Sequence, residues 1–299
     1  MKLVHTAEFD LGVVRDNDVV DITSIFDDIR YRSSLDRVPK LLGAFMERRS
    51  EIEQLAENAD SGTSLQEVKI LAPVPRPPKL VACLRNYYEG VDRERETQDM
   101  FLESPDSVIG SGGVVVLPSH EADIFHHEAE LAVVIGKRSK DLAADESALD
   151  AIAGYTMAID VSGRGIGRMG PSRMGKSFST FTPLGPMILT ADEVSDPQNL
   201  EVELSVNGEL RQSYSTSDME YSVVEVLAFL SSYMTLVPGD VLMLGTNHQG
   251  LGPVQDGDEV AMTIDGFGSL EVSVVDEMKR SWPVGIDEAV AARTRGETA

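Results

Sequence analysis

The sequence predicts an α+β fold that is mostly β, in which a mixed β-sandwich or barrel-like roll follows a small N-terminal domain. Two observations lead to this prediction. From residue 79 onward, short apolar runs are separated by turn residues rich in Gly and Pro, which is typical of a β core. Residues 73–78 hold four prolines in six positions, which fit neither a helix interior nor a central strand. We therefore expect a small α+β domain over 1–72, a main domain over 73–282 and a polar tail over 283–299.

The first 72 residues predict one hairpin and one helix. Valine pairs at 13–14 and 19–20 flank four charged or polar residues, which is the pattern of two short strands joined by a turn. Residues 38–58 place apolar side chains on one broad face at helical spacing, so we expect a helix there.

The sequence of the main domain predicts mostly strands and few helices. The expected strands are the apolar runs 114–117, 131–135, 155–159, 202–206, 241–244, 260–264 and 270–275. Two segments, 146–153 and 222–234, have helical spacing instead, and we expect a helix at each.

The composition excludes several classes of protein. The chain has 299 residues with 50 Asp and Glu against 26 Lys and Arg, a net charge of −24, which repels nucleic-acid phosphates. Only eight of the basic residues are lysines, and this acidic, lysine-poor composition favours a salt-adapted protein over a merely acidic one. The chain has no apolar run near the roughly 20 residues of a membrane helix and no signal-peptide pattern. Since Cys83 is the single cysteine, we expect a cytoplasmic protein without internal disulfides.

Two glycine-rich patterns between residues 165 and 177 resemble nucleotide-binding motifs. Residues 170–177 match the P-loop pattern and residues 165–170 match the dinucleotide fingerprint. Both motifs require a strand before the glycines and a helix after them. The prolines at 183 and 186 exclude that helix, so we do not expect a nucleotide site.

Three acidic residues stand at the ends of expected strands. Glu128 and Glu130 are two residues apart, so on a strand their side chains share one face. Two carboxylates at this spacing either bind a hard cation between them or lie exposed on an edge strand. Asp160 ends another apolar run, where an aspartate can equally be a turn or cap residue.

The order of these and other motifs gives a stronger signal than any one of them. Residues 127–136 read HEAELAVVIG, 154–164 read GYTMAIDVSGR, and 175–186 read GKSFSTFTPLGP. They are followed by VNGE at 206–209, LVPGDV at 236–241, GTN at 245–247 and GFGSL at 266–270, and preceded by RNY at 85–87. Over about residues 79–275, in this order, the chain resembles the fumarylacetoacetate hydrolase family.

This resemblance implies a mixed β-roll, usually in a homodimer, and a set of site residues. Glu128, Glu130 and Asp160 would bind Mg²⁺, or alternatively Mn²⁺ or Ca²⁺. The substrate would be a 2-oxo acid or a 1,3-dicarbonyl compound, whose enolate the metal stabilises. The residues expected to contact it are Lys176 as a catalytic group, and Arg164, Tyr87, Gly245, Thr246 and Asn247 as binding groups.

The sequence departs from the family pattern where a water-activating base is expected. Gly90 stands in the place of the usual His, Arg93 in the place of the usual Glu, and Gly167 replaces a usual Gln. Glu89 and His126 are our main substitutes for the catalytic base. Asp92, Glu94, His127 and His248 are further possibilities, and the charged stretch 92–103 could form a lid that brings in a base.

Three functions therefore remain open from the sequence. The first is metal-dependent hydrolysis of a C–C bond in an acylpyruvate-like substrate. The second is metal-dependent isomerisation or tautomerisation, decarboxylation or dehydration of a 2-oxo acid, which needs no activated water. The third is a catalytically impaired, metal-binding homodimer.

Overall fold

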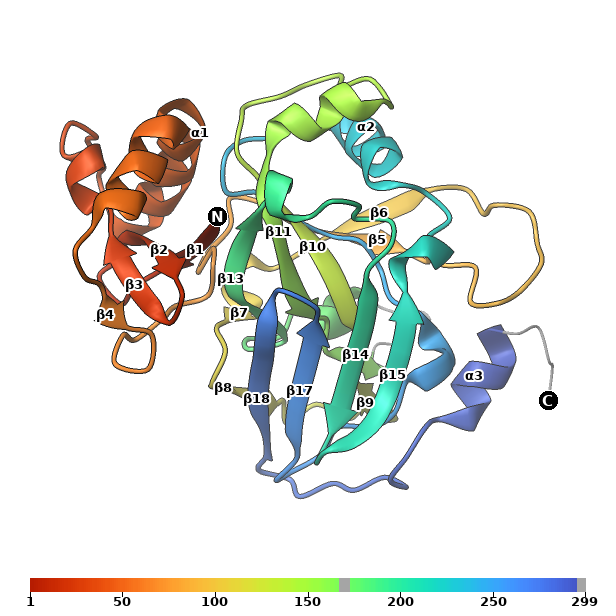
Figure 1. Ribbon diagram of the computed structural model, residues 1–299. Helices are drawn as coiled ribbons and strands as arrows, with labels where there is room; N and C mark the ends of the chain where they lie inside the picture. Colours follow the sequence, from red (N-terminus) through yellow and green to blue (C-terminus); the bar gives the residue numbers. More distant parts are fainter. Residues whose placement is uncertain (167–172, 295–299) are drawn as a thin grey trace.

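The fold is known from a computed structural model that describes residues 1–166 and 173–294 (Figure 1). Gly167 and the rest of 167–172, where the two glycine-rich motifs overlap, lie outside the described residues. Within the described part, the strands form a large mixed sheet, a five-stranded sheet and a two-stranded sheet.

The large sheet has the strand order β4-β3-β2-β1-β13-β11-β10-β16-β5-β6, with β7 paired to β13. Its strands are β1 (Lys2–His5), β2 (Leu11–Arg15), β3 (Asp18–Asp21), β4 (Thr63–Ser64), β5 (Leu80–Leu84), β6 (Asp99–Glu103), β7 (Val108–Ile109), β10 (Ala129–Ile135), β11 (Ile152–Ile159), β13 (Thr182–Thr190) and β16 (Val241–Met243). β10 and β11 are central, and all of their residues are buried. A strand buried on both faces reads as an unbroken apolar run, which is how both appear in the sequence.

The five-stranded sheet has the order β15-β14-β17-β18-β8 and packs against one face of the large sheet. Its strands are β8 (Gly113–Leu117), β14 (Glu201–Val206), β15 (Glu209–Ser215), β17 (Glu259–Ile264) and β18 (Gly268–Asp276); the separate pair is β9 (Ile124–His126) with β12 (Ser162–Arg164). Figure 1 shows β14, β15, β17 and β18 in front of β10 and β11. The predicted mixed β-roll is confirmed, and each strand predicted from the sequence is present.

Within residues 1–166 and 173–294, three α-helices lie outside the sheets: α1 (Ser34–Asn58), α2 (Val223–Tyr233) and α3 (Glu288–Thr294). Short 3₁₀ turns are η1 (Thr23–Phe26), η2 (Pro105–Ser107), η3 (Glu146–Ala151), η4 (Arg173–Lys176), η5 (Ala191–Glu193), η6 (Thr216–Asp218) and η7 (His248–Gly250). α2 begins with a capping box between Ser222 and Glu225. The helix expected over 146–153 is only the 3₁₀ turn η3, because the chain enters β11 at Ile152 and pairs there with Ile135.

The N-terminal strands extend the large sheet. β1 pairs with β13, with Leu3 opposite Ile188, so the first strands continue the sheet that holds β10 and β11. α1 and the strands beneath it share one apolar core with the outer face of that sheet. In Figure 1 these residues nevertheless project to one side as a distinct lobe. We keep the division into 1–72, 73–282 and 283–299 as a proposal.

The segment after Pro283 includes an element that the sequence pattern did not predict. Glu288–Thr294 forms α3, which contacts η7, and the backbone N–H of Asp287 donates to the carbonyl of Leu251 at 2.7 Å. The last described part of the chain therefore packs on the main domain. Among the described residues, no helix is long and apolar enough to cross a membrane.

Candidate metal centre and active site

Two adjacent strands bring the three acidic residues together. Glu130 lies in β10 opposite Ala158 of β11, Glu128 precedes β10 and Asp160 follows β11. The backbone N–H of Asp160 donates to the carbonyl of Glu128 at 2.8 Å, which fixes the two strand ends side by side. Each residue offers a carboxylate oxygen, and the three oxygens lie within 4.8 Å of one another. The three side chains are buried, so they are not exposed acids on an edge strand.

The charges of this cluster favour a bound cation. Burial and the neighbouring carboxylates raise the pKa of Glu130 well above its usual range, and burial raises the pKa of Asp160 to about 6. In addition, Oδ1 of Asp160 is buried and accepts no hydrogen bond from any described residue. A carboxylate oxygen costs free energy when it is buried without a partner. An all-oxygen set of this kind fits a hard divalent cation such as Mg²⁺, Mn²⁺ or Ca²⁺.

Lys176 partly neutralises the cluster in this structure. It ends η4, and its Nζ donates to Oε2 of Glu128 and to Oγ of Ser162, both at 2.6 Å, and also to Asp160. Burial would lower the pKa of this lysine, but the carboxylates of Asp160 and Glu128 raise it above its usual value. In the structure Lys176 thus contacts two of the three predicted metal ligands.

Arg164 and His126 flank Glu128 on neighbouring strands. Ser162 of β12 pairs with His126 of β9, and Arg164 pairs with Glu128 through its guanidinium. Nε of Arg164 lies 3.3 Å from Nδ1 of His126, whose Nε2 lies 3.1 Å from a carboxylate oxygen of Asp287. Burial, then the charge of Arg164, lowers the pKa of His126 to about 4. His126 is therefore neutral at ordinary pH, and both of its ring nitrogens have partners.

The loop after β16 closes another side of the cluster. The N–H of Gly245, a residue with φ of +87°, donates to Oε2 of Glu130 at 2.6 Å. The hydroxyl of Thr246 accepts a hydrogen bond from Nε2 of Gln212 at 2.8 Å, and Asn247 caps η7 through its side chain. Gly245 thus contacts a predicted metal ligand directly, whereas Thr246 and Asn247 are held by protein partners.

Comparison with known proteins identifies the family. Residues 79–275, more than half of the chain, match the family described as fumarylacetoacetate (FAA) hydrolase, C-terminal. Maleylpyruvate hydrolase of Aquipseudomonas alcaligenes is 34% identical over 296 residues, which cover 92% of this chain and 99% of that protein. This chain belongs to the fumarylacetoacetate hydrolase family.

A solved structure and a further relative show which fold and which kinds of enzyme occur among similar proteins. Maleylpyruvate hydrolase from Sphingobium sp. SYK-6, crystallised with a manganese(II) ion and pyruvate, is 34% identical with a TM-score of 0.82, covering 92% of this chain and 99% of that one. An oxaloacetate tautomerase of Bacillus subtilis is 37% identical over 221 residues, which are 69% of this chain and 73% of that protein. The predictions of a family enzyme and of its fold are therefore confirmed, and its relatives include hydrolases and tautomerases.

The segment in which this chain departs from the family pattern lies next to the η7 loop. Tyr87 is buried, and its ring packs edge-on against that of Tyr214 with centroids 5.1 Å apart, so its side chain lies in the core. Glu89 is buried as well, and Oε1 of its carboxylate lies 2.5 Å from Nδ1 of His248. The structure thus brings together two residues that the sequence offered only as separate candidates for a base.

Two buried polar residues near the cluster were not predicted. Gln212 of β15 joins His127, the N–H of Ala129 and Thr246 in one hydrogen-bonded set. Glu103 ends β6 and is buried; burial and then the charge of Asp160 raise its pKa well above its usual range. Gln212 has no sequence signal, because one polar side chain in a strand gives no indication of which interior group it contacts. Glu103 was included only as the last residue of the charged stretch 92–103, which the structure instead ends in strand β6.

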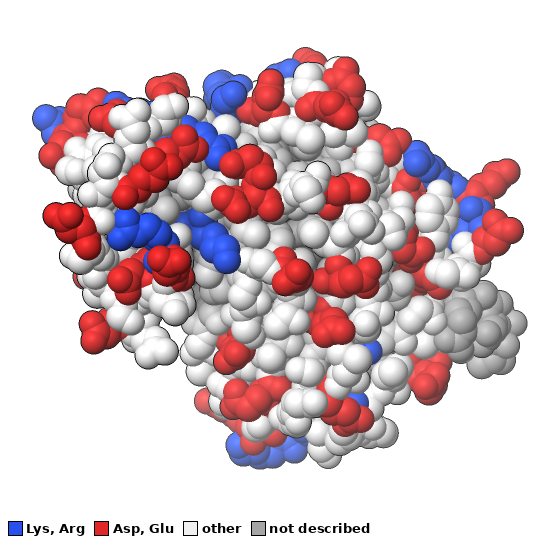
Figure 2. Space-filling view, viewed as in Figure 1, with Lys and Arg blue, Asp and Glu red and all other residues white. Residues whose placement is uncertain are grey.

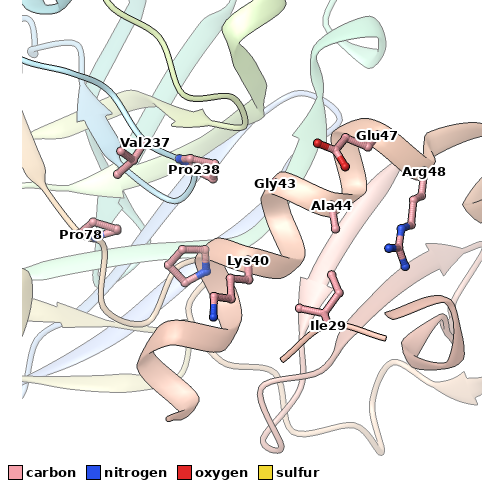
Figure 3. A pocket seen from close by; sticks show the side chains of 10 residues that line it. Ile29, Lys40, Gly43, Ala44, Glu47, Arg48, Pro78, Val237 and Pro238 are labelled. Atoms are coloured by element: carbon pink, nitrogen blue, oxygen red, sulfur yellow. The ribbon is translucent and has the colours of Figure 1, made fainter. Parts of the chain in front are cut away.

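One surface hollow lies away from this site. It has a volume of about 390 Å³ and lies between α1 and the turn before β16. Figure 3 shows Lys40 and Gly43 of α1 on one side of it and Pro78, Val237 and Pro238 on the other. No residue of the acidic cluster lines this hollow. At the cluster itself, Lys176 and Arg164 both form ion pairs with Glu128.

Proposed function

We propose that this protein is a divalent-metal-dependent hydrolase that cleaves a C–C bond in an acylpyruvate-like substrate. The observation that carries the proposal is the buried set of Glu128, Glu130 and Asp160, with Lys176 and Arg164 both paired to Glu128. The full-length similarity to a maleylpyruvate hydrolase supports this substrate class. It is further supported by the relative crystallised with manganese(II) and pyruvate, which is a 2-oxo acid.

The three carboxylates would hold Mg²⁺ or Mn²⁺, with Ca²⁺ as an alternative. A cation there would supply the positive charge that stabilises an enolate oxygen. Lys176 adds a second positive charge at the same place, because its ammonium already contacts Glu128 and Asp160. Arg164 is well placed to contact the substrate, since its side chain is partly exposed while its guanidinium contacts the cluster.

The remaining predicted residues have less direct roles in this proposal. Gly245 holds Glu130 in place through its backbone N–H, and Thr246 and Asn247 shape the loop in which the substrate carboxylate binds. Tyr87 lines the interior behind that loop. Glu89 and His126 are the acid–base candidates carried over from the sequence, and each has a hydrogen-bonded partner close to the cluster.

Tautomerisation of a 2-oxo acid is the second candidate. It is favoured by Gly90 in place of the family histidine and by the oxaloacetate tautomerases among the relatives, which are 37% identical from Bacillus subtilis and 39% identical from Bos taurus. Proton transfer at carbon requires no activated water, so the same cation site would serve both reactions.

One experiment separates the two candidates. Acetylpyruvate and enol-oxaloacetate are followed by ultraviolet absorbance with the Mn²⁺-loaded protein, in water enriched in ¹⁸O. Hydrolysis places ¹⁸O in the new carboxylate of the acetate product, whereas tautomerisation consumes enol-oxaloacetate without cleavage. Glu128→Ala should abolish turnover, and Glu277→Ala, which removes an exposed acid, should not. Turnover that survives both chelation and Glu128→Ala would refute the metal-dependent proposal.

We also propose a homodimer formed through the edge of the five-stranded sheet. Val114 and Val116 of the edge strand β8 point outward with 42% and 43% of their surface exposed. Val275 of the adjacent β18, opposite Val116 in the register, is 40% exposed. Neighbouring exposed valines on an edge strand favour pairing with another chain, and a second copy offers the same surface.

Adaptation to high salt is a separate proposal. Figure 2 shows acidic side chains spread over the visible face with far fewer basic ones. The net charge is −24, so the folded chain repels itself unless salt screens the charges.

A further inference from the structure

The first relevant feature is the turn that carries Glu89. Glu89 has φ of +60° and Gly90 has φ of +72°, and a left-handed conformation is uncommon for a residue with a side chain. The turn is held by Asp218, whose Oδ2 accepts the N–H of Glu89 at 2.7 Å. This backbone turns the Glu89 carboxylate inward, where only 9% of the residue is exposed. A strained turn that buries a carboxylate points to a function for that carboxylate.

The second feature is the partner of that carboxylate. Nδ1 of His248 lies 2.5 Å from Oε1 of Glu89, and Nε2 of Gln249 donates to Oε2 at 3.4 Å. The same Oδ2 of Asp218 that holds Glu89 also accepts from Nδ2 of Asn247 at 3.3 Å, and Asn247 caps the turn that begins with His248. A single aspartate oxygen thus anchors both sides of the Glu89–His248 pair.

The third feature is the position of His248 relative to the acidic cluster. Gly245, three residues before it, donates its N–H to Glu130. Thr246, two residues before His248, is joined through Gln212 to His127 and to the N–H of Ala129, the two neighbours of Glu128 along the chain. The His248 side chain keeps 20% of its surface exposed. No described residue forms a hydrogen bond to its Nε2.

These contacts select one tautomer of the histidine. An ionised carboxylate only accepts hydrogen bonds, so Glu89 requires the proton of neutral His248 to be on Nδ1. The lone pair of Nε2 is then free to accept a proton from water. His126 differs, because Arg164 and Asp287 occupy both of its nitrogens.

From this geometry we infer that His248 is the general base that activates water, and that Glu89 is the positioning residue that orients it. The inference rests on the proposed hydrolytic function. Nε2 of His248 takes one proton from water while the water oxygen forms a bond to the carbonyl carbon of the acyl group. The C–C bond then breaks, and its electron pair passes to the enolate of the 2-oxo acid. The imidazolium returns the proton to the enolate carbon, so the products are a carboxylic acid and a 2-oxo acid. The pair replaces the base that Gly90 removes.

The test compares His248→Gln and His248→Ala with His120→Gln, using Mn²⁺-loaded protein and acetylpyruvate. His120 is an exposed histidine that packs on Phe178, so it controls for the loss of a histidine. We expect both His248 variants to lower kcat by about 10²- to 10⁴-fold while Mn²⁺ affinity and the melting temperature stay near the wild-type values. Added imidazole should restore part of the activity of His248→Ala. His120→Gln should keep kcat within about twofold of wild type.

Glu89→Gln tests the positioning role. The Glu89 carboxylate holds the proton of His248 on Nδ1, so its replacement should lower kcat by about 10-fold or more while KM, Mn²⁺ affinity and the melting temperature stay near the wild-type values. A merely structural role would lower the melting temperature together with kcat.

The outcomes distinguish a failure of the role of His248 from a failure of the proposed function. Wild-type cleavage of acetylpyruvate with undiminished kcat in both His248 variants would overturn the inference and leave the proposed function intact. Absence of cleavage by the wild-type protein, with Mn²⁺ bound, would overturn the proposed hydrolysis and the role of His248 together.

Discussion

Nζ of Lys176 lies 2.6 Å from Oε2 of Glu128 and also contacts Asp160. One ammonium therefore forms ion pairs with two of the three carboxylates that fit a divalent cation. An ammonium and a metal ion that share carboxylate oxygens oppose each other, because each neutralises the charge that attracts the other.

Replacing Lys176 should lower both stability and activity, but Mn²⁺ should restore only the stability. We expect Lys176→Met to destabilise the metal-free protein by about 3–5 kcal/mol, because buried carboxylates lose their counter-charge. Mn²⁺ should restore most of the lost stability and should bind more tightly than to wild type at pH 8, while turnover falls by at least about 10²-fold. Thermal unfolding with and without Mn²⁺ checks the stability, and calorimetric titration checks the affinity. Weaker Mn²⁺ binding in this variant would contradict the proposed opposition.

Binding of Mn²⁺ should stabilise the wild-type protein through Glu130. A ligand at 100 times its Kd adds about 2.7 kcal/mol to the free energy of unfolding, and the melting temperature should rise accordingly. Glu130→Gln keeps an acceptor for the N–H of Gly245 but removes a charged ligand, so it should lose most of this rise. Glu103→Gln is the matched control, since Glu103 is a buried acid that lies outside the cluster of three. An equal loss in both variants would show that the effect is not specific to the cluster.

Buried histidines should make the protein acid-sensitive above the range in which carboxylates titrate. His5 is fully buried at the end of β1, and burial lowers its pKa from 6.5 to about 4. Between these values the unfolded chain binds a proton that the folded chain does not, so stability falls as the pH drops from about 6.5 to about 4. For His5 alone the loss reaches up to about 3 kcal/mol.

His5→Leu should reduce this pH dependence. Urea unfolding at pH 7.5 and pH 5 measures it, and the difference between the two pH values should be smaller in the variant. His126 and His127 also have pKa values of about 4 because of burial, so part of the dependence should remain. An unchanged difference would mean that His5 does not contribute.

A charge on the exposed edge strand should break the proposed dimer. We expect Val116→Glu to shift the mass in solution from dimer to monomer, because a carboxylate buried in a symmetric interface faces its own copy. Light scattering after size exclusion measures this mass, and Leu210→Glu, on the opposite edge strand β15, is the control. A wild-type monomer would exclude the proposal.

Salt should stabilise the protein. The self-repulsion of a net charge of −24 is screened when the ionic strength rises. We expect the melting temperature to increase between 0.1 and 2 M KCl by at least about 2–4 °C, which corresponds to roughly 1 kcal/mol. Full stability and activity in dilute buffer would contradict salt adaptation.

Part of the fold could be predicted because local patterns decided it. β10 and β11 are buried on both faces, and their apolar runs were visible in the sequence. The two-residue spacing of Glu128 and Glu130 also sufficed to place their side chains together, since strand geometry fixes which face each residue takes. The 3₁₀ turn η3 was mistaken for a longer helix because helical spacing over a few residues does not reveal where the next strand begins to pair.

The sequence by itself therefore determined the family, the strand-rich core and the residues of the acidic cluster, because these depend on short-range pattern and on motif order. Only the tertiary structure decided which groups surround that cluster. It brought Lys176 onto Glu128 and packed Asp287, from the expected tail, against His126. It also paired Glu89 with His248, although 159 residues separate them along the chain. Contacts over such separations are set by how the two sheets and their loops pack, and no local spacing specifies that packing.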